Sequence, residues 1–543
     1  MATPNAELPL PMTAAEDHGA WAPLRVRLFR ALWLAGIFSN VGTFMHNVGA
    51  GWAITELTTS PTQVSLLQAM WTVPGFLFAV IAGALADVID RRRLIIATQI
   101  ASMVCAAVLG VLALTDHLTV PALLGLTFAL SAALTLAAPA FMAVTPELVE
   151  RPMLGQAIAL NSISMNIAQA AGPALAGLAI AAAGPAAVFF ANTVSFLGIV
   201  LVVGRYRPVV DNTLPAEHIR AAMRTGLRFV RNSPRLMSLA ARLVLFLTVT
   251  SALAALLPLI ARERLHAGAG LFGVLATAGG VGAVVALGVL PRVRRRLSAD
   301  RVVLLGAAVW CAGAALLATT SSVAVACVGL AFTGGASMTT MTSIFTVYQS
   351  DLPTWVRGRA SSVVMLVVWL GASVGSVGWG VLGSRVGLES TLLVAAGTNF
   401  VVALLATKLL PIGDASPSDL TPVHWAMPQL KFEPSPSDGP VMVSIEWQIN
   451  PERAEEFAGA MTALGRLRRR DGAIEWRLFH DLEQPGRMVE SFIVATWGEH
   501  ERQHHRTIAE DAAIEAPARA MLIAGDPVVS HLLAQSPPHK PQS

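Results

Sequence analysis

Charged residues are scarce in this sequence. Asp, Glu, Lys and Arg make up 13% of the 543 residues, whereas soluble globular proteins carry about 25%. Hydrophobic residues make up 54%, and they gather in runs near the roughly 20 residues that cross a bilayer. This composition excludes an ordinary soluble protein and predicts a polytopic membrane protein surrounded by a lipid bilayer.

Cysteine and N-terminal basic residues are also scarce. Cys105, Cys311 and Cys327 each lie inside an apolar run, so we expect packing residues and no disulfide or metal site. Segment 1–23 is Pro-rich and lacks the basic start of a signal peptide, which predicts a disordered cytoplasmic tail. The net charge of +4 is explained by basic loops of a membrane protein, so no nucleic-acid partner is expected.

Twelve apolar runs predict an all-α fold of twelve transmembrane helices in two six-helix repeats. The runs lie near 29–54, 63–86, 93–115, 119–144, 155–183, 186–204, 236–260, 269–291, 302–320, 322–346, 359–384 and 388–410. We therefore expect an N-terminal bundle over 24–204 and a C-terminal bundle over 236–410. The connecting loop 205–235 has apolar residues at helical spacing and basic residues elsewhere, which predicts a short amphipathic helix.

Lys and Arg are unequally divided between the connections. With the N-terminus inside the cell, 22 of them up to Lys408 fall in cytoplasmic segments, and three fall on the other side. Basic residues are retained on the cytoplasmic side of membrane proteins. The count therefore predicts that both termini are cytoplasmic.

The two halves share a repeated pattern of small residues. Gly172 recurs as Gly375, 203 residues later, and Gly83 recurs as Gly288 at a separation of 205. Several such matches in order suggest duplication of a six-helix unit. Asp87 corresponds to Arg292, so the second copy lacks this carboxylate.

Charge is concentrated in the connection Gly83–Arg93, which contains two carboxylates and three guanidiniums between two spans. Burying these groups in lipid is costly, so we expect them at the cytoplasmic edge, paired with one another. Small residues at Gly83, Ala84 and Ala86 would let two helices approach closely there.

The chain changes character after Leu410. Segment 411–440 is rich in proline and predicts a stiff, extended linker. Segment 441–534 alternates strand and helix patterns in the order β-α-β-β-α-β, which predicts a soluble ferredoxin-like domain on the cytoplasmic side.

Polar residues inside spans are the candidates for a substrate site. They are Asn40, His46, Asn47, Gln68, Asn161, Asn166, Gln169 and, near the start of the seventh span, Arg242. The amides either line a central cavity or form hydrogen bonds between helices. Arg242 either meets an anionic substrate or extends to the membrane interface. His46 is either a proton carrier or a neutral, hydrogen-bonded histidine.

Two further features concern movement and energy. Gly172 and Pro173 lie within the fifth span, where proline bends the helix and glycine permits close contact. Such a kink suits a helix that moves between two states, although packing alone also explains it. No Asp or Glu lies in the middle of a span, so a carboxylate proton relay is not visible.

Several motifs resemble known families. The G-x-L-A-D-x-x-x-R-R pattern that starts at Gly83, the Gly-Pro pair and the twelve spans resemble the major facilitator superfamily over about 24–410. A further set is similar to its enterobactin-exporter-like branch, also called transmembrane secretion effectors: Trp52…Leu57-Thr58…Ser60-Pro61, Pro146-Glu147-Leu148-Val149, Asn161-Ser162 and Gly172-Pro173. Arg468–Trp476 and Trp497–His504 resemble the antibiotic-biosynthesis monooxygenase domain found at the C-terminus of some relatives.

The resemblance implies an alternating-access secondary transporter in the bacterial cytoplasmic (inner) membrane, exporting a siderophore, drug or secondary metabolite. It implies exchange for protons, an inner gate formed by Asp87 with Arg91 or Arg92, and a homodimer through the C-terminal domain. The alternative is a membrane-tethered enzyme or sensor whose activity resides in that domain. We expect no cofactor. His500 and His504 are four apart on a predicted helix, but no third ligand is evident, so no metal site is expected.

Overall fold

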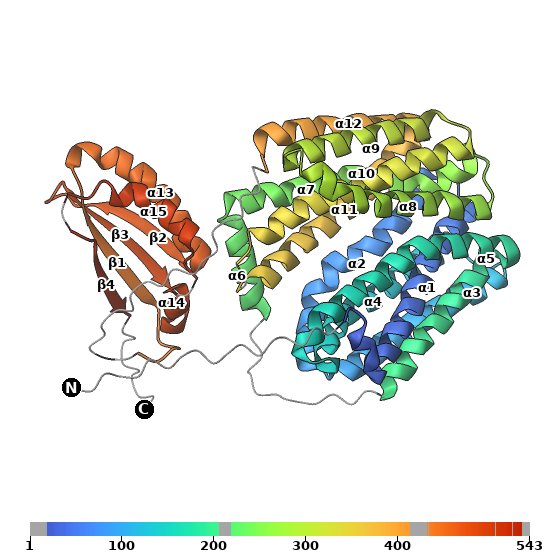
Figure 1. Cartoon of the computed structure of the whole chain (residues 1–543), viewed down its shortest axis with the longest axis horizontal. Helices are drawn as coiled ribbons and strands as arrows, with labels where there is room; N and C mark the ends of the chain where they lie inside the picture. The colour runs from blue at the N-terminus through green and yellow to red at the C-terminus, as the bar shows by residue number, and fades with distance from the viewer. Residues whose placement is uncertain are drawn as a thin grey trace, which may run out of the picture.

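The computed structural model contains a long helical body and a smaller α/β body beside it (Figure 1). It describes residues 19–205, 219–353, 355–412, 432, 434–504, 506–523 and 525–534. Most of the predicted tail 1–23 and of the predicted linker 411–440 lies outside these residues.

Five long helices form the first half of the helical body. They are α1 (Arg27–Leu57), α2 (Pro61–Val88), α3 (Arg91–Leu114), α4 (Val120–Leu148) and α5 (Leu154–Arg205). The starts of α2, α3 and α4 follow ordinary capping rules. Pro61 begins α2, and the Asp90 carboxylate accepts a hydrogen bond of 2.8 Å from the backbone N–H of Arg93 at the start of α3.

The 52-residue helix α5 contains two spans. Ala183 and Gly184 have non-helical backbone angles, and Gly184 has φ 74°, a left-handed conformation that glycine adopts without strain. Because 52 helical residues would measure about 78 Å, more than twice a bilayer core, a single straight span is excluded.

Contacts with α1 show that the chain reverses within α5. Along the first part the order is parallel to α1, because Trp33 donates to the Leu160 carbonyl at 2.8 Å and Phe44 lies against Gly172. Along the second part the order is antiparallel, because Gly49 lies against Val188 and Gly42 lies against Asn192. The eleven long apolar helices of the described residues therefore contain the twelve predicted spans.

The second half repeats this arrangement after the short helix α6 (Ile219–Arg231). Its long helices are α7 (Pro234–Leu259), α8 (Ala269–Arg294), α9 (Ala299–Thr319), α10 (Val323–Ser350), α11 (Arg357–Val386) and α12 (Leu388–Leu409). Helix α6 is the helix predicted in the loop between the halves. Phe229 and Val230, at the end of α6, are buried in a cluster with residues of α7, α10 and α11. Gly226 of α6 lies against the backbone of Arg359.

The C-terminal body is a four-stranded antiparallel sheet with helices on one face. Its elements are β1 (Val441–Gln448), α13 (Ala454–Asp471), β2 (Glu475–His480), β3 (Arg487–Val494), α14 (Trp497–His504), α15 (Ala509–Arg519) and β4 (Val528–Leu533). The strand order β2-β3-β1-β4 confirms the predicted ferredoxin-like fold, with the second helix divided into α14 and α15.

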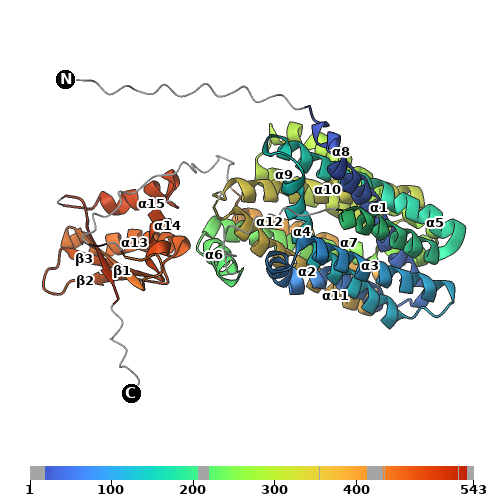
Figure 2. The same cartoon turned by 90° about the horizontal axis from the view of Figure 1, so that it is seen from below.

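Alternation along β1 explains which face is covered. Val443, Ile445 and Trp447 point to the buried side, where the Trp447 ring lies 5.6 Å from Phe457 of α13. In both views this body lies beside α6, at one end of the long helices (Figure 1 and Figure 2).

Candidate functional site

A cavity of about 820 Å³ lies within the first half of the helical body. It is bounded by α1 to α5 and by one side chain of α11, Trp369. The lining side chains are amides, hydroxyls, aromatic rings and aliphatic groups, and none of those described is Asp, Glu, Lys or Arg. They include Phe29, Trp33, Ser39, Asn40, Thr43, Trp71, Gln99, Ser131, Thr135, Phe141, Thr145, Asn161, Ser164 and Trp369. The cavity can therefore solvate a polar aromatic molecule without offering it an ionic partner.

Two of the predicted polar residues line this cavity. The Asn40 amide donates from Nδ2 to Ser164 Oγ at 3.3 Å, and Asn161 donates from Nδ2 to Thr145 Oγ1 at 3.3 Å. Each bond joins neighbouring helices, so the two readings, cavity lining and contact between helices, both apply to these residues. The bonds hold the amides in place at the cavity wall.

His46 lies behind the cavity wall. It is fully buried, with its ring 4.9 Å from the Phe189 ring and 6.5 Å from the Trp71 ring. Neither ring nitrogen has a hydrogen-bond partner among the described residues. A buried polar group without a partner is costly, so this histidine calls for an explanation other than packing.

The remaining predicted residues lie elsewhere. Gln68 borders a second cavity of about 350 Å³, between α2 and the helices α7 to α11. Asn47 is half-buried, Asn166 and Gln169 are exposed, and none of the three lines either cavity. Their assignment as substrate ligands stays a prediction.

Arg242 is held by an acid of its own half. Arg242 is 3% exposed, and its guanidinium pairs with Asp300 at the start of α9. The same carboxylate accepts a hydrogen bond of 3.0 Å from the backbone N–H of Ile412, after α12. Arg242 therefore forms an ion pair within its own half. The sequence had suggested either contact with an anionic substrate or extension to the membrane interface.

The two halves touch along α2 and α11. Thr62 Oγ1 lies 2.7 Å from Ser384 Oγ, and Thr72 Oγ1 lies 2.6 Å from Ser373 Oγ. Farther along the same contact, Gly75 lies against Trp369. Farther along α2, a Cβ built on Gly83 would meet nothing within 4 Å. Gly83 itself thus meets no neighbouring helix, because the halves separate toward that end, whereas Ala86 is buried against helices of the first half.

A second contact between the halves runs along α5 and α8. A Cβ on Gly177 would come 2.8 Å from Cα of Gly273, and a Cβ on Gly273 would come 2.7 Å from the Pro173 carbonyl oxygen. Gly172 is packed equally closely, since its Cβ would come 2.5 Å from the Phe44 Cβ. Pro173 therefore lies where the fifth span crosses the second half, and Gly172 packs against α1 of its own half.

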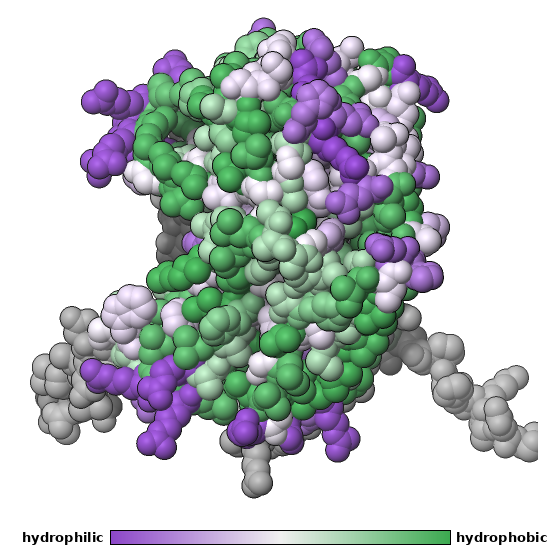
Figure 3. Space-filling model, turned by 90° about the vertical axis from the view of Figure 1, so that its right-hand side faces the viewer, coloured by the Kyte–Doolittle hydropathy of each residue, from purple (hydrophilic) through white to green (hydrophobic). Residues whose placement is uncertain are grey.

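Beyond these crossings, side chains seal one end of the molecule. The Trp52 ring of α1 lies 5.8 Å from the Phe272 ring of α8, and Arg262 donates to Thr55 Oγ1 at 3.4 Å. Figure 3 looks onto this end and shows hydrophobic and weakly polar residues across its middle, with hydrophilic ones mainly toward the edges. The halves are thus closed at the end away from the C-terminal body and separate toward the other end.

The charged connection between α2 and α3 lies at the separated end. Arg91 pairs with Glu147 of α4, and Arg92 donates to the backbone carbonyls of Val203, at 3.3 Å, and Gly204. Two of the three guanidiniums therefore bind partners on α4 and α5, and the predicted pairing within the connection stays a prediction. The Asp87 side chain is outside the described part of the structure.

The C-terminal body contacts this end of the second half. Glu499 accepts a hydrogen bond of 3.2 Å from Arg228 of α6 and one of 2.7 Å from Arg506. The Arg506 guanidinium lies 4.4 Å from the Trp355 ring centre, in the connection before α11. Although burial acts in the opposite direction, the hydrogen bonds and charges of Arg506 and Arg502 lower the pKa of the Glu499 carboxyl.

Two six-span halves that are closed against each other at one end, with a cavity bounded by the first half and Trp369, define a secondary transporter of the major facilitator type. Within that class, the chain belongs to the transmembrane secretion effector family, whose model matches residues 18–538. It is a multi-pass membrane protein that transports small molecules.

Curated relatives agree with this assignment. The chain is 22% identical to the staphyloferrin A transporter of Staphylococcus aureus, over 60% of this chain and 82% of that protein. It is 29% identical to the enterobactin exporter EntS of Shigella boydii, over 43% of this chain and 56% of that protein.

Solved structures share the fold at low identity. A bacterial homologue of the human lysosomal transporter Spinster, in an inward-facing and occupied conformation, matches with a TM-score of 0.58 and 14% identity. The match covers 71% of this chain and 97% of that one. The nucleoside transporter NupG matches with a TM-score of 0.57 and 12% identity, over 70% of this chain and 98% of that one.

Sequence reasoning missed the aromatic part of the site. Trp71, Phe141 and Trp369 line the large cavity, but an aromatic residue in an apolar run has the same pattern as a core residue. It also missed the partner of Arg91, although Glu147 stands in a motif that the sequence made visible.

Proposed function

We propose that this protein exports a small, metal-chelating or drug-like molecule from the cytoplasm across the bacterial inner membrane by alternating access. The observation that carries the proposal is the cavity of about 820 Å³, whose described lining residues carry no charge and which is closed at the end opposite to the Gly83–Arg93 connection. A siderophore is the first class to test, ahead of drugs and other secondary metabolites.

The proposed direction of transport is inferred from the distribution of basic residues between the two ends of the helical body. The connections at the separated end contain most of the 22 basic residues assigned to the cytoplasm, so the cavity faces the cytoplasm in the described state. An exporter loads its substrate in this state. Closure at the Gly83–Arg93 end, with Asp87 and Arg91 or Arg92 as the latch, would accompany opening at the Trp52–Phe272 end.

The chemistry of the lining supports the substrate class. Indole and phenyl rings stack with aromatic groups, and the amides and hydroxyls supply hydrogen bonds. The relatives named for staphyloferrin A and enterobactin support the same class. Because no charged side chain lines the large cavity among the described residues, a neutral, metal-free molecule fits it better than a charged chelate.

The test is a transport assay in a strain from which this transporter has been deleted. Export of siderophores and accumulation of drugs are compared between the deletion strain, the restored strain and a strain that expresses Asp87→Asn. Retention of a siderophore in the deletion strain supports the proposal, and unchanged export of every compound contradicts it. Transport by Asp87→Asn equal to that of the parent contradicts the proposed gate.

Two further parts of the proposal concern energy and assembly. Proton exchange would require a titratable group, and His46 is the candidate because its imidazole is buried beside the cavity wall. Dimerisation would use the uncovered face of the sheet, where Met442, Phe479 and Leu532 are exposed. Chemical cross-linking in native membranes, with and without residues 441–534, tests the dimer.

The rival function is a membrane-tethered enzyme or sensor. Family membership over residues 18–538 favours the transporter. Catalysis by the C-terminal body would be supported if residues 440–534 turned over an aromatic substrate, or if their removal abolished a cellular activity and left transport intact.

A further inference from the structure

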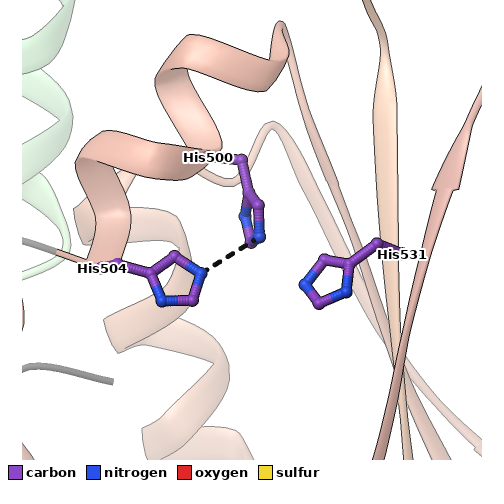
Figure 4. A group of neighbouring side chains, drawn as sticks. All are labelled: His500, His504 and His531. Carbon is purple, nitrogen blue, oxygen red and sulfur yellow. Dashed lines mark hydrogen bonds between the residues drawn. The ribbon is translucent and has the colours of Figure 1, made fainter. Parts of the chain in front are cut away.

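Three histidines from two elements converge in the C-terminal body. His500 and His504 lie one turn apart on α14, and His531 lies on β4 (Figure 4). Pairing of His531 with Val443 of β1 turns its side chain to the face that the helices cover. Nitrogen atoms of the three rings lie within 4.8 Å of one another. The fold thus supplies the third ligand that sequence spacing did not reveal.

The separation of two ring nitrogens matches shared coordination. His500 Nε2 lies 3.2 Å from His504 Nε2. Two imidazoles on a tetrahedral zinc ion, with Zn–N bonds of about 2.0–2.1 Å, place their nitrogens about 3.4 Å apart. Because the ligand atoms of the three rings lie within 4.8 Å of one another, shared coordination of one ion requires a shift of the His531 ring toward the other two.

A neighbouring amide orients the first ring. His500 Nδ1 lies 3.1 Å from the Gln503 side-chain oxygen, which only accepts hydrogen bonds. Nδ1 therefore donates, and the lone pair of Nε2 points toward His504. Metal-binding histidines are commonly fixed in this way through their second nitrogen. Trp497 completes the surroundings, with its ring 5.3 Å from His500 and 6.1 Å from His531.

The type of ligand atom and the exposure of the three histidines indicate which class of ion could bind. The cluster offers only imidazoles, which suit first-row divalent transition metals, whereas calcium and magnesium require oxygen ligands. His500 and His504 are 3% and 6% exposed, while His531 is half-buried and leaves an approach from outside. Three protein ligands leave one position of a tetrahedron for water or for a small donor molecule.

We propose that His500, His504 and His531 form a binding site for a first-row divalent transition-metal ion. The ion would tie α14 to β4. Glu499, next to His500 on α14, accepts the hydrogen bond from Arg228 of α6. Metal binding would thus stabilise the helix by which the C-terminal body contacts the transporter.

Cobalt and zinc titrations of the full-length protein test the site. The protein is purified in detergent without a polyhistidine tag and stripped of metal with a chelator. We expect one Co²⁺ per chain with the visible absorption of tetrahedral coordination, displacement of that signal by Zn²⁺, and a higher unfolding temperature with either ion. His500→Gln, His504→Gln and His531→Gln should each weaken Co²⁺ binding at least 10-fold. The control is His480→Gln, whose ring instead bonds the Pro485 carbonyl.

Two results would contradict the proposed metal site. If the intact protein takes up no stoichiometric Co²⁺, or if the three variants bind it as the parent does, the histidines are only a hydrogen-bonded cluster. A measurement without substitutions covers the case of a variant that does not fold. Electron paramagnetic resonance of bound Cu²⁺ counts coordinated imidazole nitrogens, and fewer than three overturns the proposal.

Discussion

Gly177 of α5 and Gly273 of α8 are in backbone contact across the two halves. A Cβ on Gly177 would come 2.8 Å from Cα of Gly273 and 3.0 Å from the Gly270 carbonyl oxygen. Backbone atoms cannot move aside as the end of a flexible side chain can. The closed end of the molecule therefore depends on the absence of a side chain at this crossing.

A methyl group at this crossing should weaken the described state. We expect Gly177→Ala to force α5 and α8 apart at a cost of about 1–3 kcal/mol and to slow transport about 10-fold. Transport by proteoliposomes measures the effect. Gly125→Ala is the matched control, because a Cβ on Gly125 meets nothing within 4 Å. Equal rates for both variants would contradict the importance of the contact.

The cavity amides should contribute to substrate affinity. Asn40→Leu keeps the side-chain size but removes the hydrogen bond to Ser164 and leaves that hydroxyl without its donor. We expect KM for export to rise about 10-fold, with a smaller change in maximal rate. Thr407→Val on the exposed side of α12 serves as the control. An unchanged KM in Asn40→Leu would exclude this wall of the cavity from binding.

A substitution at His46 distinguishes a role in proton coupling from a role in packing. His46→Phe places an apolar ring between Trp71 and Phe189, so we expect the protein to fold and insert at least as well as the parent. If His46 carries the proton, uphill transport driven by a pH gradient should be lost, while exchange of substrate for substrate persists. His117→Gln, in an exposed connection, should change neither. Full pH-driven transport by His46→Phe would remove His46 as the carrier.

Trp355 should hold the C-terminal body against the second half. Trp355→Ala removes the ring beneath the Arg506 guanidinium, a contact of about 0.5–2 kcal/mol. We expect several-fold faster proteolytic release of the soluble body from membranes. Arg453→Gln breaks an exposed pair with Glu456 inside the same body and should leave the release rate unchanged. Equal release from the parent and Trp355→Ala would mean that other contacts hold the body in place.

Much of the fold could be predicted from patterns that act locally. Apolar runs predicted the twelve spans, including the division near Gly184 within the single helix α5. This was possible because the length of an apolar run and the conformation of a glycine each depend on one segment of the chain. The order of strand and helix patterns over 441–534 likewise predicted the ferredoxin-like sheet. In the site, Asn40 and Asn161 were found because an amide in an apolar run stands out.

Features that join distant segments escaped the sequence. Trp369 reaches a cavity otherwise built by the first half, and Arg91 binds Glu147, 56 residues away. His531 joins His500 only because β4 pairs with β1. In each case the packing of the fold determines which residue is the partner. The residue type alone does not identify it, because Trp, Glu and His occur in many other roles.

Helix α6 gives the soluble body a defined place in the transport cycle. Its glycine, Gly226, lies against the backbone of Arg359, and Arg228 reaches Glu499. Trp355 makes the second attachment, also on the second half. Rocking of one half against the other would therefore swing the soluble body relative to the first half. A spectroscopic distance from this body to α4 would then report, turnover by turnover, which way the transporter faces.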